Sequence, residues 1–261
     1  MSAVTILSTT NLCIGYATEK VVNQIASELN LNLAEGKLIA LIGANGVGKS
    51  TLLRTLTGIQ KPISGSVELA GKPLDGLGAS EMAQQISVVL TENLPPSNLT
   101  VFELVALGRQ TYTDWMGILS SDDKKMIEWA MEQTQIVDLK YKKHHEISDG
   151  QLQRVLISRA LAQDTPLIIL DEPTTHLDLL HKVSLVKLLK KLSKETNKCI
   201  VFSTHDIDMA IQVADEMIVM TADSVVQDEP CNLISKGTFS KLFDDSSITF
   251  DATFGKFIIS G

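Results

Sequence analysis

The stretch GANGVGKST, residues 43–51, restricts the fold more than any other part of the chain. It follows the continuous apolar run LIALI at residues 38–42, which is typical of a strand buried on both faces of a parallel sheet. It leads into residues 50–56, whose pattern indicates a helix. A glycine-rich loop between a buried strand and a helix is a setting in which backbone N–H groups and the helix dipole bind phosphate. The order of these elements predicts an α/β fold with a nucleotide site at this edge of the sheet.

The side chains of this loop have expected roles toward a nucleoside triphosphate. Lys49 would reach the β- and γ-phosphates, and Ser50 would offer its hydroxyl to Mg²⁺. The loop residues expected at the nucleotide are Gly43, Asn45, Gly46, Gly48, Lys49, Ser50 and Thr51. The alternative is a glycine-rich turn that matches by chance, and the flanking strand and helix make it the weaker interpretation.

Composition limits the classes of protein to which the chain can belong. With 261 residues and 44% hydrophobic content, it is long and apolar enough to bury a sizeable core in one large domain or two small ones. The net charge of −8 gives no general attraction to nucleic acid or anionic lipid. The cysteines at 13, 199 and 231 lack the spacing of a zinc site or a disulfide framework, which favours a reducing compartment. The N-terminus lacks the pattern of a signal peptide, and no apolar run approaches the ~20 residues of a membrane span, so we expect a soluble chain that can dock on a membrane protein.

Strand patterns occur on both sides of the phosphate loop. Before it, strands are predicted over residues 4–12 and 29–33. After it, SGSVELAGKPL at residues 64–74 predicts a hairpin around a glycine-containing turn. Further along, apolar runs predict parallel strands at residues 167–170, 199–202 and 217–220, with a crossover helix over 179–192.

Residues 99–162 are predicted to form a helical insertion. The expected helix starts are a capping box of Thr100 with Glu103, a cap by Ser121 of a helix through Leu139, and a capping box of Ser148 with Gln151. The tail from residue 223 is predicted to contain short strands and turns.

The motif LIILDEP, residues 167–173, ends an apolar strand with two adjacent acids. The carboxyl end of a strand is the edge at which open α/β sheets gather their ligands. Asp171 is expected to contribute to the Mg²⁺ shell, and Glu172 to polarise a water for in-line attack on the γ-phosphate. The alternative is a solvated acidic turn, which the phosphate loop disfavours.

The motif FSTHD, residues 202–206, places His205 just beyond another core strand. Alone, such a histidine is more often structural. Beside Glu172 and a γ-phosphate, its imidazole is expected to hydrogen-bond the phosphate and steady the attacking water.

Taken in this order, the phosphate loop, ISDGQ at residues 147–151, the acidic strand end and the histidine motif resemble the nucleotide-binding subunit of an ATP-binding-cassette (ABC) transporter. The resemblance implies an α/β P-loop NTPase fold with a mostly parallel core sheet, an antiparallel β subdomain and a helical insertion. The implied parts are a nucleotide-binding core at 1–92 and 163–222, a helical signature subdomain at 93–162, and C-terminal strands and turns at 223–261.

The resemblance also implies that two copies pair head to tail around ATP and Mg²⁺. ISDGQ stands where the family commonly has LSGGQ, and Ser148, Gly150 and Gln151 of one copy would then contact the γ-phosphate held by the other. The same residues also form an ordinary helix cap, and the two roles are compatible. Asp149 departs from the usual glycine, and its carboxylate is expected to repel the γ-phosphate unless it points away.

Further positions are transferred from the same resemblance. THLD, residues 175–178, matches the loop that crosses to the partner cassette, and Asp178 is assigned to it. Tyr16 matches the aromatic residue on which adenine stacks, with a core or surface tyrosine as the alternative. Glu92 stands where the family usually has a glutamine that contacts Mg²⁺ and the attacking water. It keeps an acceptor oxygen but adds charge and loses the amide donor.

Two stretches indicate a subgroup of this family. LTVFELVALGRQTYTDWMG at residues 99–117 and GTFSKLFDDSSITFD at 237–251 resemble cassettes that power uptake of iron–siderophore complexes, haem and cobalamin. The implied partners are polytopic permease subunits and, indirectly, an extracytoplasmic substrate-binding protein. The implied location is the cytoplasmic face of the inner membrane. Permease contact is expected through the helical insertion and the Glu92 loop, where residues 94–96 either present an apolar surface or are buried anchors.

Two other classes of function remain as alternatives. A cassette ATPase acting on nucleic acid or ribosomes is disfavoured, because the chain has no long coiled coil, second cassette or basic face. A non-hydrolysing regulatory module is suggested by the unusual Asp149 and Glu92. Loss of hydrolysis on Glu172→Gln would separate the enzyme from that module.

Overall fold

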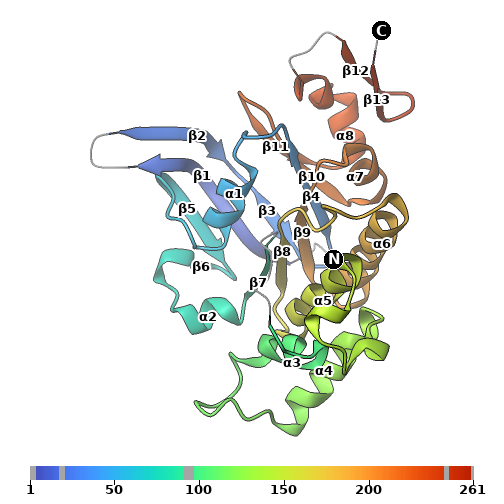
Figure 1. Cartoon of the computed structure of the whole chain (residues 1–261). Coiled ribbons are helices and arrows are strands. Elements are labelled where there is room, and N and C mark those ends of the chain that lie inside the picture. Colours follow the sequence, from blue (N-terminus) through green and yellow to red (C-terminus); the bar gives the residue numbers. More distant parts are fainter. Residues whose placement is uncertain (1–3, 18–20, 91–96, 244–246, 260–261) are drawn as a thin grey trace.

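The computed structural model describes residues 4–17, 21–90, 97–243 and 247–259 (Figure 1). Across these residues, no helix has the length and apolar character needed to span a membrane. Glu92 and residues 94–96 lie outside the described residues, so their predicted roles stay predictions.

A six-stranded sheet forms the centre of the molecule. Its order is β11 (Val225–Asp228), β10 (Glu216–Met220), β4 (Leu38–Gly43), β9 (Cys199–Ser203), β8 (Leu167–Leu170) and β7 (Ile86–Val89). All neighbours are parallel except β11, which pairs antiparallel with β10 at one edge. Every residue of β4, β8 and β9 is buried, as their continuous apolar runs predict. The mostly parallel core sheet is confirmed.

Alternate residues of the central strands enter two separate hydrophobic clusters, because successive side chains of a strand point to opposite faces. Ile39 and Leu41 pack with α1 (Lys49–Leu56) and strands of the second sheet. Ala40 and Ile42 pack with helices that include α6 (Leu179–Glu195). The central sheet is therefore covered on both faces.

The second sheet is antiparallel and supplies the predicted antiparallel β part. It pairs β2 (Val22–Leu29), β1 (Thr5–Ala17), β5 (Ser64–Leu69) and β6 (Lys72–Pro73) in that order, and β3 (Asn32–Ala34) also pairs with β1. The hairpin predicted at residues 64–74 is β5–β6. It is followed by a 3₁₀ turn at Leu74–Gly76 and by α2 (Ala79–Ala83).

The strand predicted at residues 29–33 is wrong, because the backbone leaves β2 at Leu29 and enters β3 at Asn32. Thr9 of β1 stabilises the turn between β2 and β3. Its N–H donates to the Leu31 carbonyl at 3.0 Å, and its hydroxyl accepts from the Leu31 N–H at 2.8 Å. Strand β2 itself was not predicted. Most of its residues are exposed or half-buried, so it lacks a strong apolar pattern.

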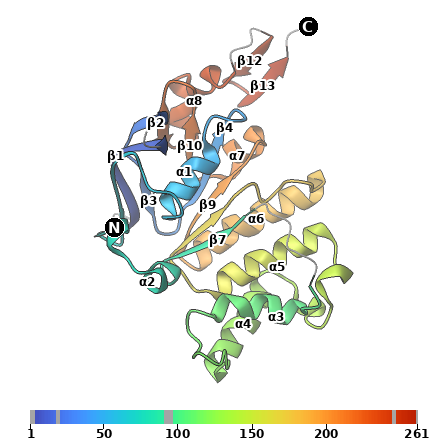
Figure 2. The ribbon, with the colours of Figure 1, turned by 60° about the vertical axis from the view of Figure 1, so that its left-hand side comes forward.

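The helical insertion is confirmed and groups at one end of the molecule (Figure 2). It contains α3 (Val101–Ala106), α4 (Ser121–Gln133) and α5 (Asp149–Ala162), with 3₁₀ turns at Leu107–Arg109, Val137–Leu139 and His144–Glu146. The predicted capping boxes at the starts of α3 and α5 are present. Within the insertion, Arg109 and Asp123 form a buried ion pair with Nε and Oδ1 2.8 Å apart.

The predicted limits of the middle helix are wrong by one residue at its start and by six at its end (139 minus 133). Ser120, not Ser121, caps α4, because its hydroxyl accepts from the Asp123 N–H while Asp123 Oδ2 accepts from the Ser120 N–H. The helix ends at Gln133, and Gln135 takes a left-handed φ of 60° that stops it.

The C-terminal region lies at the opposite end from the helical insertion in Figure 2. Strands β12 (Ile248–Asp251) and β13 (Lys256–Ile259) pair as predicted, after a 3₁₀ turn at Thr238–Lys241. The prediction of strands and turns alone is wrong, because α8 (Pro230–Ser235) is a helix with proline at its first residue. The rings of Phe239 and Phe250 stack with centroids 4.8 Å apart, and Phe257 meets Phe250 edge to face at 5.1 Å. The subdomain limits proposed above stay a prediction; β11 lies beyond residue 222 and extends the central sheet.

Candidate active site

The phosphate loop joins β4 to α1 and depends on glycine at particular positions. Gly48 has a φ of 112°, which L-residues rarely adopt, and an added Cβ would lie 2.3 Å from Ile25 Cγ2 of β2. Gly43 has no such φ, but an added Cβ would lie 2.6 Å from the Met220 carbonyl oxygen. The loop therefore packs tightly against both sheets, and side chains at these two positions would displace it.

Lys49 lies inside this loop and is almost completely buried. Its Nζ donates to the carbonyl oxygens of Gly43 at 2.9 Å and Ala44 at 3.2 Å. Burial lowers the pKa of Lys49, while the negative charges of Glu172 and Asp171 oppose that shift. The arrangement places a cationic donor between the loop and the two acids.

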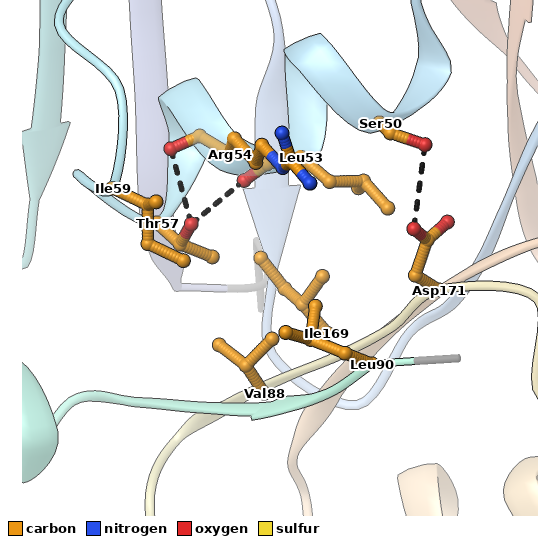
Figure 3. Close-up of a pocket in the computed structure, with 9 residues that line it drawn as sticks. All are labelled: Ser50, Leu53, Arg54, Thr57, Ile59, Val88, Leu90, Ile169 and Asp171. Atoms are coloured by element: carbon orange, nitrogen blue, oxygen red, sulfur yellow. Dashed lines mark hydrogen bonds between the residues drawn. The ribbon is translucent and has the colours of Figure 1, made fainter. Parts of the chain in front are cut away.

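The hydroxyl of Ser50 and the carboxylate of Asp171 face each other across the site (Figure 3). Ser50 Oγ lies 3.3 Å from Asp171 Oδ2. Ser50 is in the first turn of α1, and Asp171 follows β8, where its N–H donates to the Val89 carbonyl of β7 at 2.9 Å. The pair supplies two hard oxygen donors, which suit Mg²⁺.

Glu172 adopts an uncommon backbone conformation, with φ at 47°. Its carboxylate lies next to the predicted histidine: His205 Nε2 is 2.6 Å from Glu172 Oε1. The other oxygen, Oε2, accepts from Thr175 Oγ1 at 3.2 Å. Backbone strain of this kind concentrates at functional sites, where surrounding contacts hold it.

Ser203 is a site residue that the sequence analysis did not identify. Its hydroxyl donates to Asp171 Oδ1 and accepts from the Glu172 N–H, each at 2.7 Å. The available signal was a polar residue at the end of β9, beside the acidic end of β8. Ser203 belongs to the motif FSTHD, from which only His205 was predicted to act at the site.

Tyr16, on β1, contacts the first turn of α1. Its hydroxyl is 3.2 Å from Thr51 Oγ1, and the side chain is 49% exposed. A ring tied to the phosphate-loop helix and open to solvent is available for stacking with a planar base.

A cavity of about 240 Å³ opens between α1 and the strands β7 and β8 (Figure 3). Its apolar wall includes Leu53, Val88 and Ile169, and Arg54 is its basic residue. Ser50 and Asp171 also line it, so the two oxygen donors border the cavity.

The start of α5 is organised by local contacts. Ser148 Oγ accepts from the Gln151 N–H at 3.3 Å, and Gln151 Oε1 accepts from the Ser148 N–H at 3.1 Å. A Cβ on Gly150 would lie 3.3 Å from His181 Cδ2 of α6. Over the described part of the chain, no hydrogen bond joins Ser148, Gly150 or Gln151 to the phosphate loop.

Asp178 caps the adjacent helix α6. Its Oδ1 accepts from the His181 N–H at 2.9 Å and lies 2.8 Å from His181 Nδ1. These bonds, the backbone one first, lower the pKa of Asp178. Asp178 is therefore engaged at the start of its own helix.

The site residues form two groups in a single chain. The first group unites Tyr16, the loop residues from Gly43 to Thr51, Asp171, Glu172 and His205. The second group contains Ser148, Gly150, Gln151 and Asp178 at the starts of α5 and α6. The predicted roles of both groups toward ATP remain proposals.

Residues 26–175 match the family model described as ABC transporter. The chain is 40% identical to the uncharacterized ABC transporter ATP-binding protein MJ0873 of Methanocaldococcus jannaschii, over 96% of this chain and 86% of that protein. It is 37% identical to the iron(3+)-hydroxamate import ATP-binding protein FhuC of Bacillus subtilis, over 85% of this chain and 81% of the relative.

Among solved structures, the fold is similar to the dimeric ATP-binding cassette MJ0796 in a post-hydrolysis state bound to ADP and Pi. The TM-score is 0.72 at 29% identity, covering 86% of this chain and 99% of that chain. The matched family model, the two relatives and this solved structure agree on the family and on the cassette fold. The chain therefore belongs to the ABC transporter family, as an ATP-binding subunit whose ATP hydrolysis drives transport.

Proposed function

We propose that this chain powers an importer of iron–siderophore, haem or cobalamin-type substrates by hydrolysing ATP with Glu172 at its phosphate loop. The observation that carries the catalytic part is the Glu172–His205 contact of 2.6 Å, at the strand edge that also bears Asp171 and the phosphate loop. FhuC, named for iron(3+)-hydroxamate import, supports the substrate class.

Mg²⁺ fits the oxygen donors of this chain. The described residues contain no cluster of three or more His, Cys, Asp or Glu side chains able to hold a metal alone. This agrees with an ion held by one or two protein oxygens together with phosphates and water, as is usual for Mg²⁺. Ser50 and Asp171 would hold it, with Glu92 as a further proposed ligand. When bound, the ion would neutralise charge on the β- and γ-phosphates.

The chain's own residues divide the remaining chemistry. Lys49 and the N–H groups of the loop bind the triphosphate, and Tyr16 stacks with adenine. Glu172 orients a water for in-line attack and accepts its proton. His205 holds the Glu172 carboxylate in place and is close enough to this base to steady the same water or the γ-phosphate.

The second group of site residues acts in a head-to-tail homodimer. Ser148, Gly150 and Gln151 of one copy would offer donors at a helix N-terminus to the γ-phosphate held by its twin. Asp178 belongs to the loop that crosses to the partner. ATP binding closes the pair and hydrolysis reopens it, which drives the permease through alternating access.

Polytopic permease subunits would hold the chain at the cytoplasmic face of the inner membrane and receive substrate from an extracytoplasmic binding protein. The helical insertion, the Glu92 loop and the cavity at Arg54 are the proposed contact surfaces. The cavity is included because Ser50 and Asp171, the proposed Mg²⁺ ligands, are among the residues that line it. No nucleic-acid partner is proposed, since the net charge is −8.

The test replaces Glu172 by glutamine in the transporter reconstituted with its native permease. Glu172→Gln should still bind ATP, trap the closed dimer and reduce turnover by about 10²- to 10⁴-fold, the usual contribution of a general base. The exposed Glu68→Gln on β5, outside the helical insertion, is the matched control and should hydrolyse ATP like the wild type. Equal turnover by the wild type and Glu172→Gln would refute the catalytic role and favour a non-hydrolysing module.

A further inference from the structure

Ser203 occupies the last position of β9 and is completely buried. Strand β9 lies between β4 and β8, and Phe202 pairs with Leu170 at the end of β8. Ser203 therefore stands beside the chain as it leaves β8, where the two acids follow.

Both hydrogen bonds of the Ser203 hydroxyl go to these acids. Its Oγ donates to Asp171 Oδ1 at 2.7 Å and accepts from the Glu172 N–H at 2.7 Å. An amide N–H can only donate and an ionised carboxylate can only accept, so the hydroxyl proton points at Asp171. The directions of both bonds are fixed by this chemistry.

The first bond orients the carboxylate of Asp171. With Oδ1 held by Ser203, the other oxygen faces Ser50 Oγ at 3.3 Å. Rotation of the carboxylate would break this short bond and leave the proton of the buried hydroxyl without an acceptor, which is unfavourable. Ser203 therefore holds the Asp171 carboxylate in an orientation that keeps one of its oxygens next to Ser50.

The second bond holds the backbone of Glu172. A φ of 47° is disfavoured for a residue with a side chain, and Ser203 binds the N–H of this same residue. In this conformation the Glu172 carboxylate reaches both His205 and Thr175. The same hydroxyl thus positions the metal-side acid and the base together.

We propose that Ser203 is a positioning residue for ATP hydrolysis, whose single buried hydroxyl sets the orientation of Asp171 and the backbone of Glu172. This inference rests on the roles proposed above for those two acids. It predicts that loss of the hydroxyl disturbs metal binding and turnover much more than ATP affinity, because the phosphate loop and Tyr16 are untouched.

The test compares Ser203→Thr with Ser203→Val in the transporter reconstituted with its permease. The two variants have nearly the same shape and differ in the hydroxyl. Relative to the wild type, Ser203→Val should lower kcat by about 10- to 100-fold, the usual effect of losing a group that orients a metal ligand. Ser203→Thr should restore most of this loss, and the KM for ATP should change by less than ~3-fold in both.

A second readout does not depend on turnover. Mn²⁺ replaces Mg²⁺, and its affinity is measured by electron paramagnetic resonance in the presence of a non-hydrolysable ATP analogue. Ser203→Val should weaken Mn²⁺ binding by about 10-fold or more, and Ser203→Thr should not. Equal kcat and equal Mn²⁺ affinity in the two variants would overturn the proposal.

Two further variants keep the result decisive. Ser203→Ala removes the hydroxyl without adding volume, and it replaces Ser203→Val if that variant does not fold. Wild-type kcat and Mn²⁺ affinity in Ser203→Ala would also overturn the proposal. Ser158→Ala removes a buried hydroxyl of α5 that has no hydrogen-bond partner among the described residues, and it should leave both readouts unchanged. Glu172→Gln, measured in parallel, separates the two ideas: if only it loses turnover, the proposed function stands and the role of Ser203 fails.

Discussion

The two groups of site residues are built in opposite ways. Asp171, Glu172 and His205 are held by contacts between strands, such as the Ser203 bonds that join positions 31 and 32 residues apart. The start of α5 is held by Ser148 and Gln151, which are three residues apart and face solvent or are half-buried. One half-site is fixed by the core of its own chain. The other is shaped locally and left open, as expected for a surface completed by a second molecule.

The largest effect is expected at the fixed half-site. Lys49→Met removes the buried ammonium that we propose binds the phosphates, so ATP hydrolysis should fall by about 100- to 1,000-fold, as for loss of a preorganised donor. The measurement is ATPase activity of the reconstituted transporter, with the exposed Lys187→Met on α6 as control. Near wild-type activity in Lys49→Met would contradict the proposed role of the group of site residues that the core of the chain holds.

The next prediction tests whether the open half-site serves a twin. In linked dimers, Lys49→Met in one copy and Ser148→Arg in the other put both lesions into one composite site and leave the second intact. Both changes in one copy damage both sites. Trapping of ATP in the closed dimer should fall to about half in the first arrangement and by about 100-fold in the second. The reverse order, with more trapping when both changes are in one copy, would mean that each chain completes its own site.

A smaller effect is expected at Asp149, the first residue of α5, which is exposed. If its carboxylate faces the γ-phosphate of the twin, Asp149→Asn should tighten ATP-dependent dimerisation by about 3- to 10-fold, a screened interaction between like charges. Sedimentation at low and high salt measures it, and the gain should shrink at high salt. No change at low salt would indicate that the carboxylate points away.

The smallest effect concerns the cap of α6. The pKa of Asp178 is lowered by its bonds to His181, so the folded state favours the ionised carboxylate. That contribution is complete above the ordinary aspartate pKa of about 4 and is lost as pH falls through the lowered folded value. Asp178→Asn should remove this part of the fall in Tm as the pH drops below about 4. Parallel Tm curves for both proteins would show that the cap contributes nothing measurable.

The sequence predicted best what depends on a continuous pattern. The strand, loop and helix around residues 38–56, and the apolar strands that end in Asp171 and before His205, could be identified because burial on both faces leaves an unmistakable apolar run. Strand β2 could not, because it lies at the outer edge of its sheet with most side chains exposed or half-buried. Helix α8 also escaped, since its six residues bury only Leu233.

The candidate site was likewise predicted where its residues lie within one motif, and missed where strand pairing brings distant residues together. Residues within one motif, such as Lys49 and Ser50, were found from their spacing. Ser203 was missed because its importance comes from the pairing of β9 with β8, which brings a hydroxyl to acids about thirty residues earlier in the chain. The start of α4 was misplaced by one residue because Asp123 fills the capping-box position for which Glu or Gln is the usual signal.

The bonds from Lys49 to the Gly43 and Ala44 carbonyls affect the free energy that nucleotide binding must spend on ordering the loop. They cross-link the two ends of the turn, so its curvature is set when the chain folds. An arriving triphosphate has little disorder to remove from the backbone, and more of its interaction energy is available for drawing two subunits together.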